Sequence, residues 1–173
     1  MRLLRIEIEG ITSLKDKLVI DFEKDLEGED LFAITGPTGS GKSTILNCIS
    51  IALYYKSHKD LNPEDFVSLG AKRGRIVLDF EINGDRYTSL WECALYGVRG
   101  TRLKDPKPIK EFYKNGTPLD TKVYSPEQVI GLDEDQFQKT VIINQGKFSD
   151  FITSPFKDRK ILLEKIYTTE NIT

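Results

Sequence analysis

A glycine-rich stretch, followed by a run of helix-forming residues, most constrains the fold of this 173-residue chain. From Gly36 to Thr44 its letters are GPTGSGKST, which match the spacing G-x-x-x-x-G-K-[ST] of a phosphate-binding loop. The apolar residues 31–35 before the loop predict a strand covered on both faces, and residues 45–53 after it predict a helix. A strand, a glycine-rich loop and a helix in this order predict an α/β fold with an anion site at the start of the helix.

The side chains of this loop suit the phosphates of a nucleotide. Its glycines let main-chain N–H groups approach an anion closely, because no Cβ stands in the way. Lys42 supplies a positive charge for the β- and γ-phosphates, and the hydroxyl of Ser43 is a ligand that suits Mg²⁺. The residues expected to bind the nucleotide are Gly36, Pro37, Thr38, Gly39, Ser40, Gly41, Lys42, Ser43 and Thr44. The alternative is a glycine-rich turn before an ordinary helix. It is disfavoured because all the fixed positions of the motif are present, with a predicted strand before them and a predicted helix after them.

Composition sets limits on the class of protein. The net charge of −2 gives no global electrostatic reason for nucleic-acid binding, although a local basic patch remains open. Cys48 and Cys93 lack the spacing of a metal site or a disulfide framework, which fits a reducing compartment. The N-terminal residues carry charges too early for a signal peptide, and no apolar run approaches the length of a membrane span. We therefore expect a cytoplasmic protein of one domain, residues 1–173, without a membrane partner.

Alternating residues predict an antiparallel sheet beside the loop. Apolar and charged residues alternate over 3–9 and over 75–82, and Asn83-Gly84 after the second run is a strong tight-turn signal. Further strands are expected at 18–22, 86–96 and 140–144, a second hairpin within 112–124, and helical segments starting at 62–64 and spanning 125–131, 133–139, 148–152 and 156–167. The expected fold is therefore mixed α/β, with mixed or parallel core strands around the loop and a flanking antiparallel sheet with helices.

The acidic half of a hydrolytic site is missing from this pattern. A complete site of this class needs an apolar strand that ends in Asp, after the phosphate loop. Residues 18–21 have this pattern but precede the loop, whereas residues 76–79 follow it and continue alternating into a turn. Asp79 is therefore expected on a solvated strand face. If Asp79 nevertheless held Mg²⁺, the chain would be a self-sufficient small P-loop kinase or nucleoside triphosphatase. The lack of an Asn-Lys-x-Asp motif disfavours a GTPase.

A third interpretation is a nucleic-acid-binding or scaffold module that hydrolyses nothing. It depends on a locally basic stretch near the second predicted hairpin. The stretch contains Arg99, Arg102, Lys104, Lys107, Lys110 and Lys114, with the aromatic residues Phe112 and Tyr113. Binding through phosphates would weaken steeply with salt. The alternative for these residues is a solvated hairpin face.

Three stretches resemble the N-terminal segment of the SbcC-type family, the ABC/SMC-type ATPases of double-strand-break repair. The first is residues 31–44 with the phosphate loop, followed by Ala52-Leu53-Tyr54. The second is the opening residues 2–6 with Thr12-Ser13-Leu14. The third is residues 141–148, an apolar strand that ends in Asn-Gln-Gly-Lys-Phe. The resemblance covers essentially the whole chain.

The resemblance implies an ABC-type P-loop ATPase lobe that binds ATP and Mg²⁺. Gln145 would be the glutamine of the family's Q-loop, which contacts Mg²⁺ and the attacking water and senses the γ-phosphate. The implied catalytic residues are then Lys42 and Gln145, and the implied metal ligands are Ser43 and Gln145. Thr12 and Ser13 would lie near the base or the ribose.

The same resemblance implies partners that complete the site. In the family a coiled coil follows this segment, and a C-terminal segment of the same ATPase supplies the Ser-Gly-Gly signature and the acidic strand. Two heads would enclose two ATP molecules between them. Their opening and closing would regulate an SbcD-type nuclease and its access to double-stranded DNA. The lobe on its own is therefore expected to bind ATP weakly at most and not to hydrolyse it.

Overall fold

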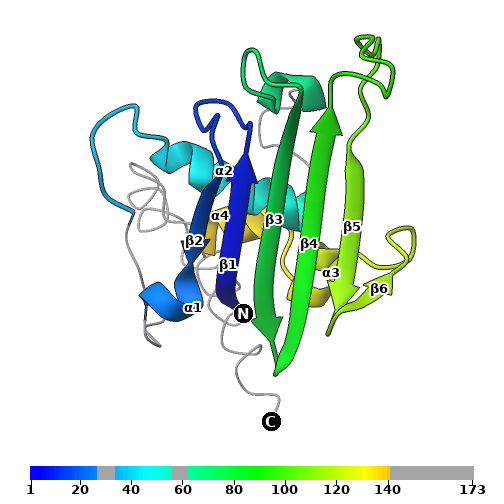
Figure 1. Cartoon of the computed structure of the whole chain (residues 1–173). Coiled ribbons are helices and arrows are strands. Elements are labelled where there is room, and N and C mark those ends of the chain that lie inside the picture. The colour runs from blue at the N-terminus through cyan, green and yellow to red at the C-terminus, as the bar shows by residue number, and fades with distance from the viewer. Residues whose placement is uncertain (27–33, 56–61, 141–173) are drawn as a thin grey trace. The chain divides into compact units, whose positions relative to one another are not determined.

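Alternating apolar residues form a six-stranded sheet in the computed structural model of the chain (Figure 1). The order of the strands is β2-β1-β3-β4-β5-β6, and every neighbouring pair is antiparallel. The strands are β1 (Arg2–Glu9), β2 (Leu18–Asp21), β3 (Arg73–Ile82), β4 (Asp85–Ala94), β5 (Ile109–Lys114) and β6 (Thr117–Leu119). The mixed α/β class and the antiparallel sheet predicted from the sequence are confirmed.

The structure describes residues 1–26, 34–55 and 62–140. Residues 139 and 140 are described by their backbone alone. The chain divides into two compact units, residues 1–130 and residues 131–173. The predicted core strand at 31–35 lies outside the described residues except for Ile34 and Thr35, which have no regular secondary structure. The predicted strand at 140–144 also lies outside the described residues, except for Thr140, which is the last residue of a helix. The helical segments predicted beyond it and Gln145 lie outside the described residues as well.

Capping residues begin η1 and α4 where the sequence predicts helical segments, whereas α1 was not predicted. The helices are α1 (Phe22–Asp25), α2 (Lys42–Tyr54), the 3-10 helix η1 (Pro63–Phe66), α3 (Pro126–Ile130) and α4 (Glu134–Thr140). Before η1, the backbone N–H of Asn62 donates to the carboxylate of Asp65 at 3.1 Å. Before α4, a carboxylate oxygen of Asp133 accepts from the backbone N–H of Gln136 at 2.8 Å. Such bonds satisfy the main-chain groups that a helix leaves free at its ends.

Two asparagine–glycine turns close the hairpins. Asn83 and Gly84 have φ angles of +50° and +79°, which a two-residue turn between twisted strands requires, so the β3–β4 hairpin is confirmed. Asn115-Gly116 does the same between β5 and β6. The second hairpin returns only over Thr117–Leu119 and not to residue 124 as predicted. The carbonyl of Asp120 accepts the N–H groups of Val123 and Tyr124 at 3.0 and 2.8 Å, which turns the chain away from the sheet.

Strand β2 is also shorter than predicted. It ends at Asp21, because Phe22 begins helix α1 and is buried there. The side chain of Asp21 accepts from the backbone N–H of Lys24 at 3.1 Å and caps that helix.

Helix α2 covers one face of the sheet and builds the core of the first unit. It packs on β1, β3 and β4, as Figure 1 shows from the opposite side. The side chains of β3 that point toward the helix are wholly buried. Ser89 on β4 is also buried, and its hydroxyl donates to the carbonyl of Ala52 on α2 at 2.6 Å. Fully buried residues of this layer include Ile6, Ile8, Ile49, Leu53, Ile76, Leu78 and Phe80. The position of α2, and of the loop before it, is therefore fixed by apolar burial.

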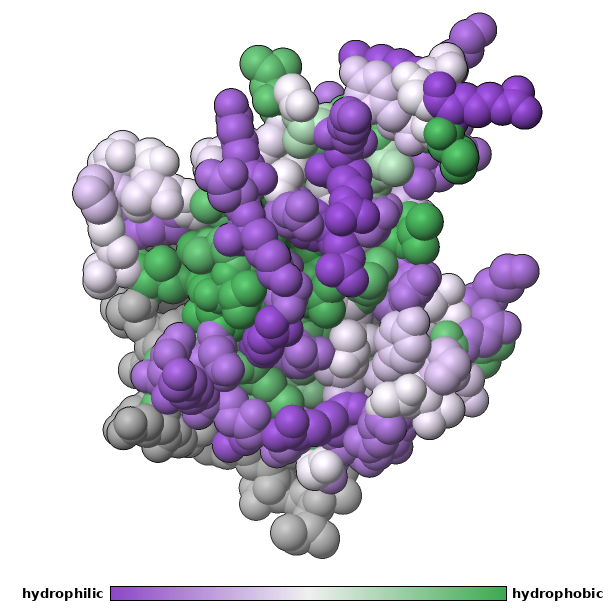
Figure 2. Space-filling model, in the orientation of Figure 1, coloured by the Kyte–Doolittle hydropathy of each residue, from purple (hydrophilic) through white to green (hydrophobic). Residues whose placement is uncertain are grey.

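The other face of the sheet carries charged side chains. In Figure 2 hydrophilic residues run along this face, with hydrophobic patches between them. Glu7 on β1 pairs with both Arg5 and Lys17, and hydrogen bonding from Lys17 is the main reason why the pKa of Glu7 is lowered. Arg75 and Glu92 face each other across β3 and β4 at 3.4 Å. A sheet with one apolar and one polar face is typical of antiparallel pairing.

Both cysteines are free thiols in the interior. Cys48 on α2 and Cys93 on β4 are completely buried, and burial raises the pKa of each thiol. They behave as small apolar residues of the core. None of the helices in the described part of the chain combines the length and the apolar character that crossing a bilayer requires.

The close approach of Gly10 to β3 yields a test of the fold. A Cβ on Gly10 would lie 2.3 Å from the carbonyl oxygen of Arg73, and the φ angle of Gly10 is +64°. We expect Gly10→Ala to lower the free energy of unfolding by about 2–4 kcal/mol, through overpacking and the left-handed backbone. Urea unfolding followed by circular dichroism measures this loss.

The control is Gly70→Ala. Gly70 has a similar φ angle of +87°, but nothing lies within 4 Å of its added Cβ. Only the cost of placing a Cβ on a left-handed backbone applies there, so the loss in the free energy of unfolding should be about 1 kcal/mol. Equal losses in the two variants would contradict the assigned contact with Arg73.

Candidate nucleotide-binding site

The glycine-rich loop leads directly into the buried helix α2. Residues 35–40 are exposed, and the helix begins at Lys42 after Gly41, whose φ angle is +90°. Gly41 is buried, and a Cβ there would lie 3.0 Å from the side chain of Leu14. The predicted order of loop and helix is confirmed. A glycine at position 41 is required both by the backbone angle and by the contact with the turn after β1.

The start of α2 offers free N–H groups to an anion. Gly41 has no side chain with which to cap the helix, and the first turn contains no acidic residue. The hydroxyl-bearing Ser43 is exposed at this end. The positive end of the helix dipole is therefore not offset by a carboxylate of its own first turn, which suits the binding of phosphate.

Lys42 folds back over the loop that precedes it. Its Nζ donates to the carbonyl oxygens of Gly36 and Pro37, both at 2.7 Å. The loop itself is closed by a weaker bond from the N–H of Ser40 to the carbonyl of Pro37 at 3.3 Å. These bonds hold the ammonium group of Lys42 beside the exposed loop, where a phosphate group would meet it.

A second segment brings hydroxyl groups to the same place. The turn after β1 lies against the first turn of α2, so that Thr12 Oγ1 and Ser13 Oγ lie 3.4 and 3.3 Å from Thr44 Oγ1. Thr12 and Ser13 are exposed. The structure thus gathers the predicted residues of the loop and the predicted pair Thr12 and Ser13 around one helix end. Gln145, the remaining predicted site residue, lies outside the described residues.

Sequence reasoning missed the residues that hold this turn in place. Leu14 packs against Gly41, and the carbonyl of Phe66 and the hydroxyl of Ser68 bond to the main chain of Thr12. Ser68 is far from the loop in the sequence and belongs to no motif. No local pattern marks it, because its role depends on how η1 and β1 meet in space.

Asp79 lies on the face of the sheet that points away from α2. Its register partner Thr88 donates to its carboxylate at 2.6 Å, whereas the neighbouring pair Leu78 and Ser89 faces the helix. Side chains alternate between the two faces of a strand, so Asp79 cannot reach the loop at the start of α2. Its predicted position on a strand face is confirmed, although the side chain is half-buried and bonded and not simply solvated.

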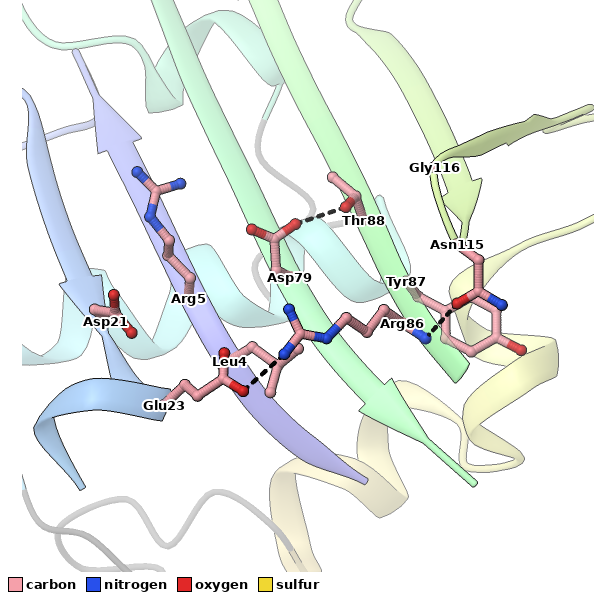
Figure 3. A pocket seen from close by; sticks show the side chains of 10 residues that line it. All are labelled: Leu4, Arg5, Asp21, Glu23, Asp79, Arg86, Tyr87, Thr88, Asn115 and Gly116. Carbon is pink, nitrogen blue, oxygen red and sulfur yellow. Dashed lines mark hydrogen bonds and ion pairs between the residues drawn. The ribbon is translucent and has the colours of Figure 1, made fainter. Parts of the chain in front are cut away.

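A cavity of about 510 Å³ lies on this polar face and is separate from the loop (Figure 3). Arg86 reaches across β3 to Glu23 at 2.7 Å, and its backbone N–H donates to the side chain of Asn115 at 2.9 Å. The cavity is lined by Leu4, Arg5, Asp21, Glu23, Asp79, Arg86, Tyr87, Thr88, Asn115 and Gly116. None of these residues belongs to the phosphate loop. The ion pair between Arg86 and Glu23 thus joins β4 to α1 at this cavity.

The predicted basic stretch is mostly engaged in contacts within the protein. Lys114 pairs with Asp85 at 2.7 Å, and this bond raises the pKa of Lys114. Lys107 pairs with Asp105 and Arg102 with Glu64, both at 3.5 Å, and Lys110 lies over the ring of Tyr55. Phe112 is only 1% exposed, so the expectation that it belongs to a binding surface was wrong. Its place in the core follows from strand alternation on β5, which sets it against Phe80 and Tyr87.

No group of three or more His, Cys, Asp or Glu side chains lies close enough to hold a metal ion within residues 1–26, 34–55 and 62–140. Among the described residues, the group that fits a magnesium-bound phosphate is the hydroxyl of Ser43 at the start of α2.

The comparison with known families agrees with this site. The AAA domain family matches residues 5–172. This chain belongs to the AAA domain family. The AAA domain match includes the loop, the helix α2 and the turn after β1, which together form the candidate site.

Individual relatives narrow the comparison. The SbcC component of the nuclease SbcCD from Clostridium acetobutylicum is 32% identical over 98% of this chain and 15% of its own length. The DNA double-strand break repair Rad50 ATPase of Methanocaldococcus jannaschii is 30% identical over 78% of this chain and 12% of its own length. The chain therefore spans less than a fifth of the length of these curated relatives. The predicted resemblance to the SbcC-type family is confirmed over nearly the whole AAA domain.

Among solved structures, the chain is similar to the SMC head domain from Thermotoga maritima. It is 25% identical, covers 71% of this chain and 40% of its own, and has a TM-score of 0.41. The assignment to the family accordingly rests on the sequence matches.

The placement of Asp79 can be tested by substitution. Because Asp79 faces away from α2, we expect Asp79→Asn to leave the affinity for nucleotide unchanged. The loss in the free energy of unfolding should stay below about 1 kcal/mol, because the amide oxygen of asparagine still accepts the hydroxyl of Thr88 and only the charge of the acceptor is lost. Titration calorimetry and urea unfolding measure the two quantities. Thr88→Val removes the bond itself, should cost about 1 kcal/mol, and serves as the control. A loss of nucleotide binding or turnover in Asp79→Asn alone would support the self-sufficient enzyme.

Proposed function

We propose that this chain, residues 1–173, is the ATP-binding N-terminal lobe of an SbcC-type ATPase head. The observation that carries the proposal is the meeting of three groups at the start of α2. Lys42 lies across the loop, Ser43 is exposed beside it, and the hydroxyls of Thr12 and Ser13 contact Thr44. Membership in the AAA domain family and the relatives named above support ATP as the nucleotide.

Lys42, the main-chain N–H groups of the loop, Ser43 and Gln145 have different roles in the proposed binding of ATP. Lys42 exchanges the carbonyls of Gly36 and Pro37 for the β- and γ-phosphates of ATP. The N–H groups of the loop and of the first turn of α2 donate to the phosphate oxygens. The hydroxyl of Ser43 would be a ligand of Mg²⁺, and the ion would offset the negative charge of the phosphates. Gln145 would offer its amide oxygen as a further ligand of Mg²⁺.

Other parts of the assembly complete the reaction. Asp79, the one acid whose strand pattern suggested a metal ligand, faces away from the loop. The proposal therefore assigns the acidic strand and the signature motif to a C-terminal segment of the same ATPase and to a second head. Closure of two heads around ATP in the cytoplasm would then regulate an SbcD-type nuclease and its access to double-stranded DNA. The printed names of the relatives, a nuclease component and a break-repair ATPase, support this class of partner.

Nucleotide binding is tested with Lys42→Ala in the protein expressed from the complete open reading frame. The loss of charge-assisted bonds to phosphate should weaken ATP–Mg²⁺ binding by roughly 10–100-fold. Equilibrium titration with a fluorescent ATP analogue measures the change. Lys24→Ala, at an exposed lysine of α1, is the matched control and should bind as the unsubstituted protein does. Equal affinity in Lys42→Ala would overturn the proposed site.

Double-stranded DNA is tested at the connection between β4 and β5. Arg99 and Lys104 are exposed there, whereas Arg102 and Lys107 pair with carboxylates. We expect the double variant Arg99→Glu/Lys104→Glu to weaken DNA binding. The magnitude of the negative slope of log K against log salt should fall by about two, one for each lost phosphate contact. Fluorescence anisotropy over a salt series measures the slope. The control is Lys24→Glu/Lys122→Glu, which reverses two exposed lysines elsewhere. The same change in both double variants would exclude a specific contact.

A further inference from the structure

Thr12 is held in a costly backbone conformation at the edge of the candidate site. Its φ angle is +44°, in the left-handed region that a β-branched residue rarely adopts. Both of its main-chain groups are bonded to one segment. Its N–H donates to the carbonyl of Phe66 at 2.8 Å, and its carbonyl accepts from the hydroxyl of Ser68 at 2.8 Å. Such a conformation persists only where surrounding bonds fix it.

Ser68 is bonded to the turn at a second point. Its backbone N–H donates to the carbonyl of Gly10 at 2.8 Å, and the residue is only 2% exposed. The segment that carries it follows η1, whose start is fixed by the bond between Asn62 and Asp65. One buried serine therefore connects to the turn through Gly10 and through Thr12. The hydroxyl of Ser68 is the only part of this connection that a side-chain substitution can remove.

The turn presents its hydroxyls to a defined side of helix α2. Thr12 Oγ1 and Ser13 Oγ lie beside Thr44 Oγ1 at 3.4 and 3.3 Å. Thr44 follows Lys42 by two positions, so the two side chains leave the helix about 200° apart. Since Lys42 serves the β- and γ-phosphates, the hydroxyls of the turn are placed for a different part of the nucleotide.

We infer that Ser68 is a positioning residue for the nucleoside end of the nucleotide site. Ser68 is buried and its hydroxyl is bonded to the carbonyl of Thr12, so it acts through the turn. It fixes the carbonyl of Thr12, and thereby the hydroxyls of Thr12 and Ser13, against Thr44. The inference rests on the proposed function, because it assumes that the loop binds the phosphates. It predicts that removal of the Ser68 hydroxyl weakens the binding of the nucleoside and spares that of the phosphates.

The test compares ATP with inorganic triphosphate, each with Mg²⁺, in the protein from the complete open reading frame. Ser68→Ala should weaken ATP binding about tenfold, the equivalent of one lost hydrogen bond, and should leave triphosphate binding unchanged. Ser68→Thr keeps the hydroxyl and should restore ATP binding. Ser89→Ala is the matched control, since it also removes a buried hydroxyl that donates to a backbone carbonyl, at Ala52 in the later half of α2. That variant should lose stability without any change in the ratio of the two affinities.

The outcomes separate this inference from the proposed function. Equal weakening of ATP and triphosphate in Ser68→Ala, or no weakening of either, overturns the positioning role. A changed affinity ratio in Ser89→Ala overturns it as well, because general loosening of the fold would then explain the effect. Failure of the unsubstituted protein to bind either ligand, or full binding by Lys42→Ala, overturns the proposed function itself. Thermal midpoints of all variants confirm that each is folded at the temperature of the titration.

Discussion

Burial of the apolar sheet face against α2 is the interaction on which the rest of this structure depends. The helix packs on β1, β3 and β4, and the side chains between them are wholly shielded from water. Each fully buried aliphatic or aromatic side chain contributes about 1.5–3 kcal/mol, far more than any exposed ion pair of the opposite face. This packing leaves the first turn of α2 beside the turn that follows β1.

The position of the helix end explains the chemistry of the site. A phosphate loop needs an uncapped helix start and glycines that can take left-handed angles, and both occur at Gly41 and Lys42. Lys42 bonds to the carbonyls of its own loop, so its charge is held in place before any phosphate arrives. The bonds between Thr12, Phe66 and Ser68 connect this site to a segment that follows it by a long stretch of chain. The site is thus assembled from three separate parts of the chain.

Strand alternation separates this site from the polar face of the sheet. Asp79 and Leu78 are neighbours in the sequence but lie on opposite faces, so the aspartate contacts Thr88 while the leucine lies in the core. The same rule buries Phe112 although charged residues surround it in the sequence. The cavity on the polar face and the phosphate loop are therefore separate features, and Asp79 belongs to the polar face and not to the loop.

Features that depend on neighbouring residues can be predicted from the amino-acid order alone. The loop from Gly36 to Thr44, the helix after it, the two asparagine–glycine hairpins and the capped helix starts each follow from local backbone preferences and short-range hydrogen bonds. Three contacts depend instead on the folded chain: Thr12 and Ser13 meet Thr44, Ser68 holds Thr12, and Asp79 faces away from the loop. These contacts join residues that are distant in the chain, and they arise from the packing of β1, η1 and α2 around one core, which no local pattern encodes.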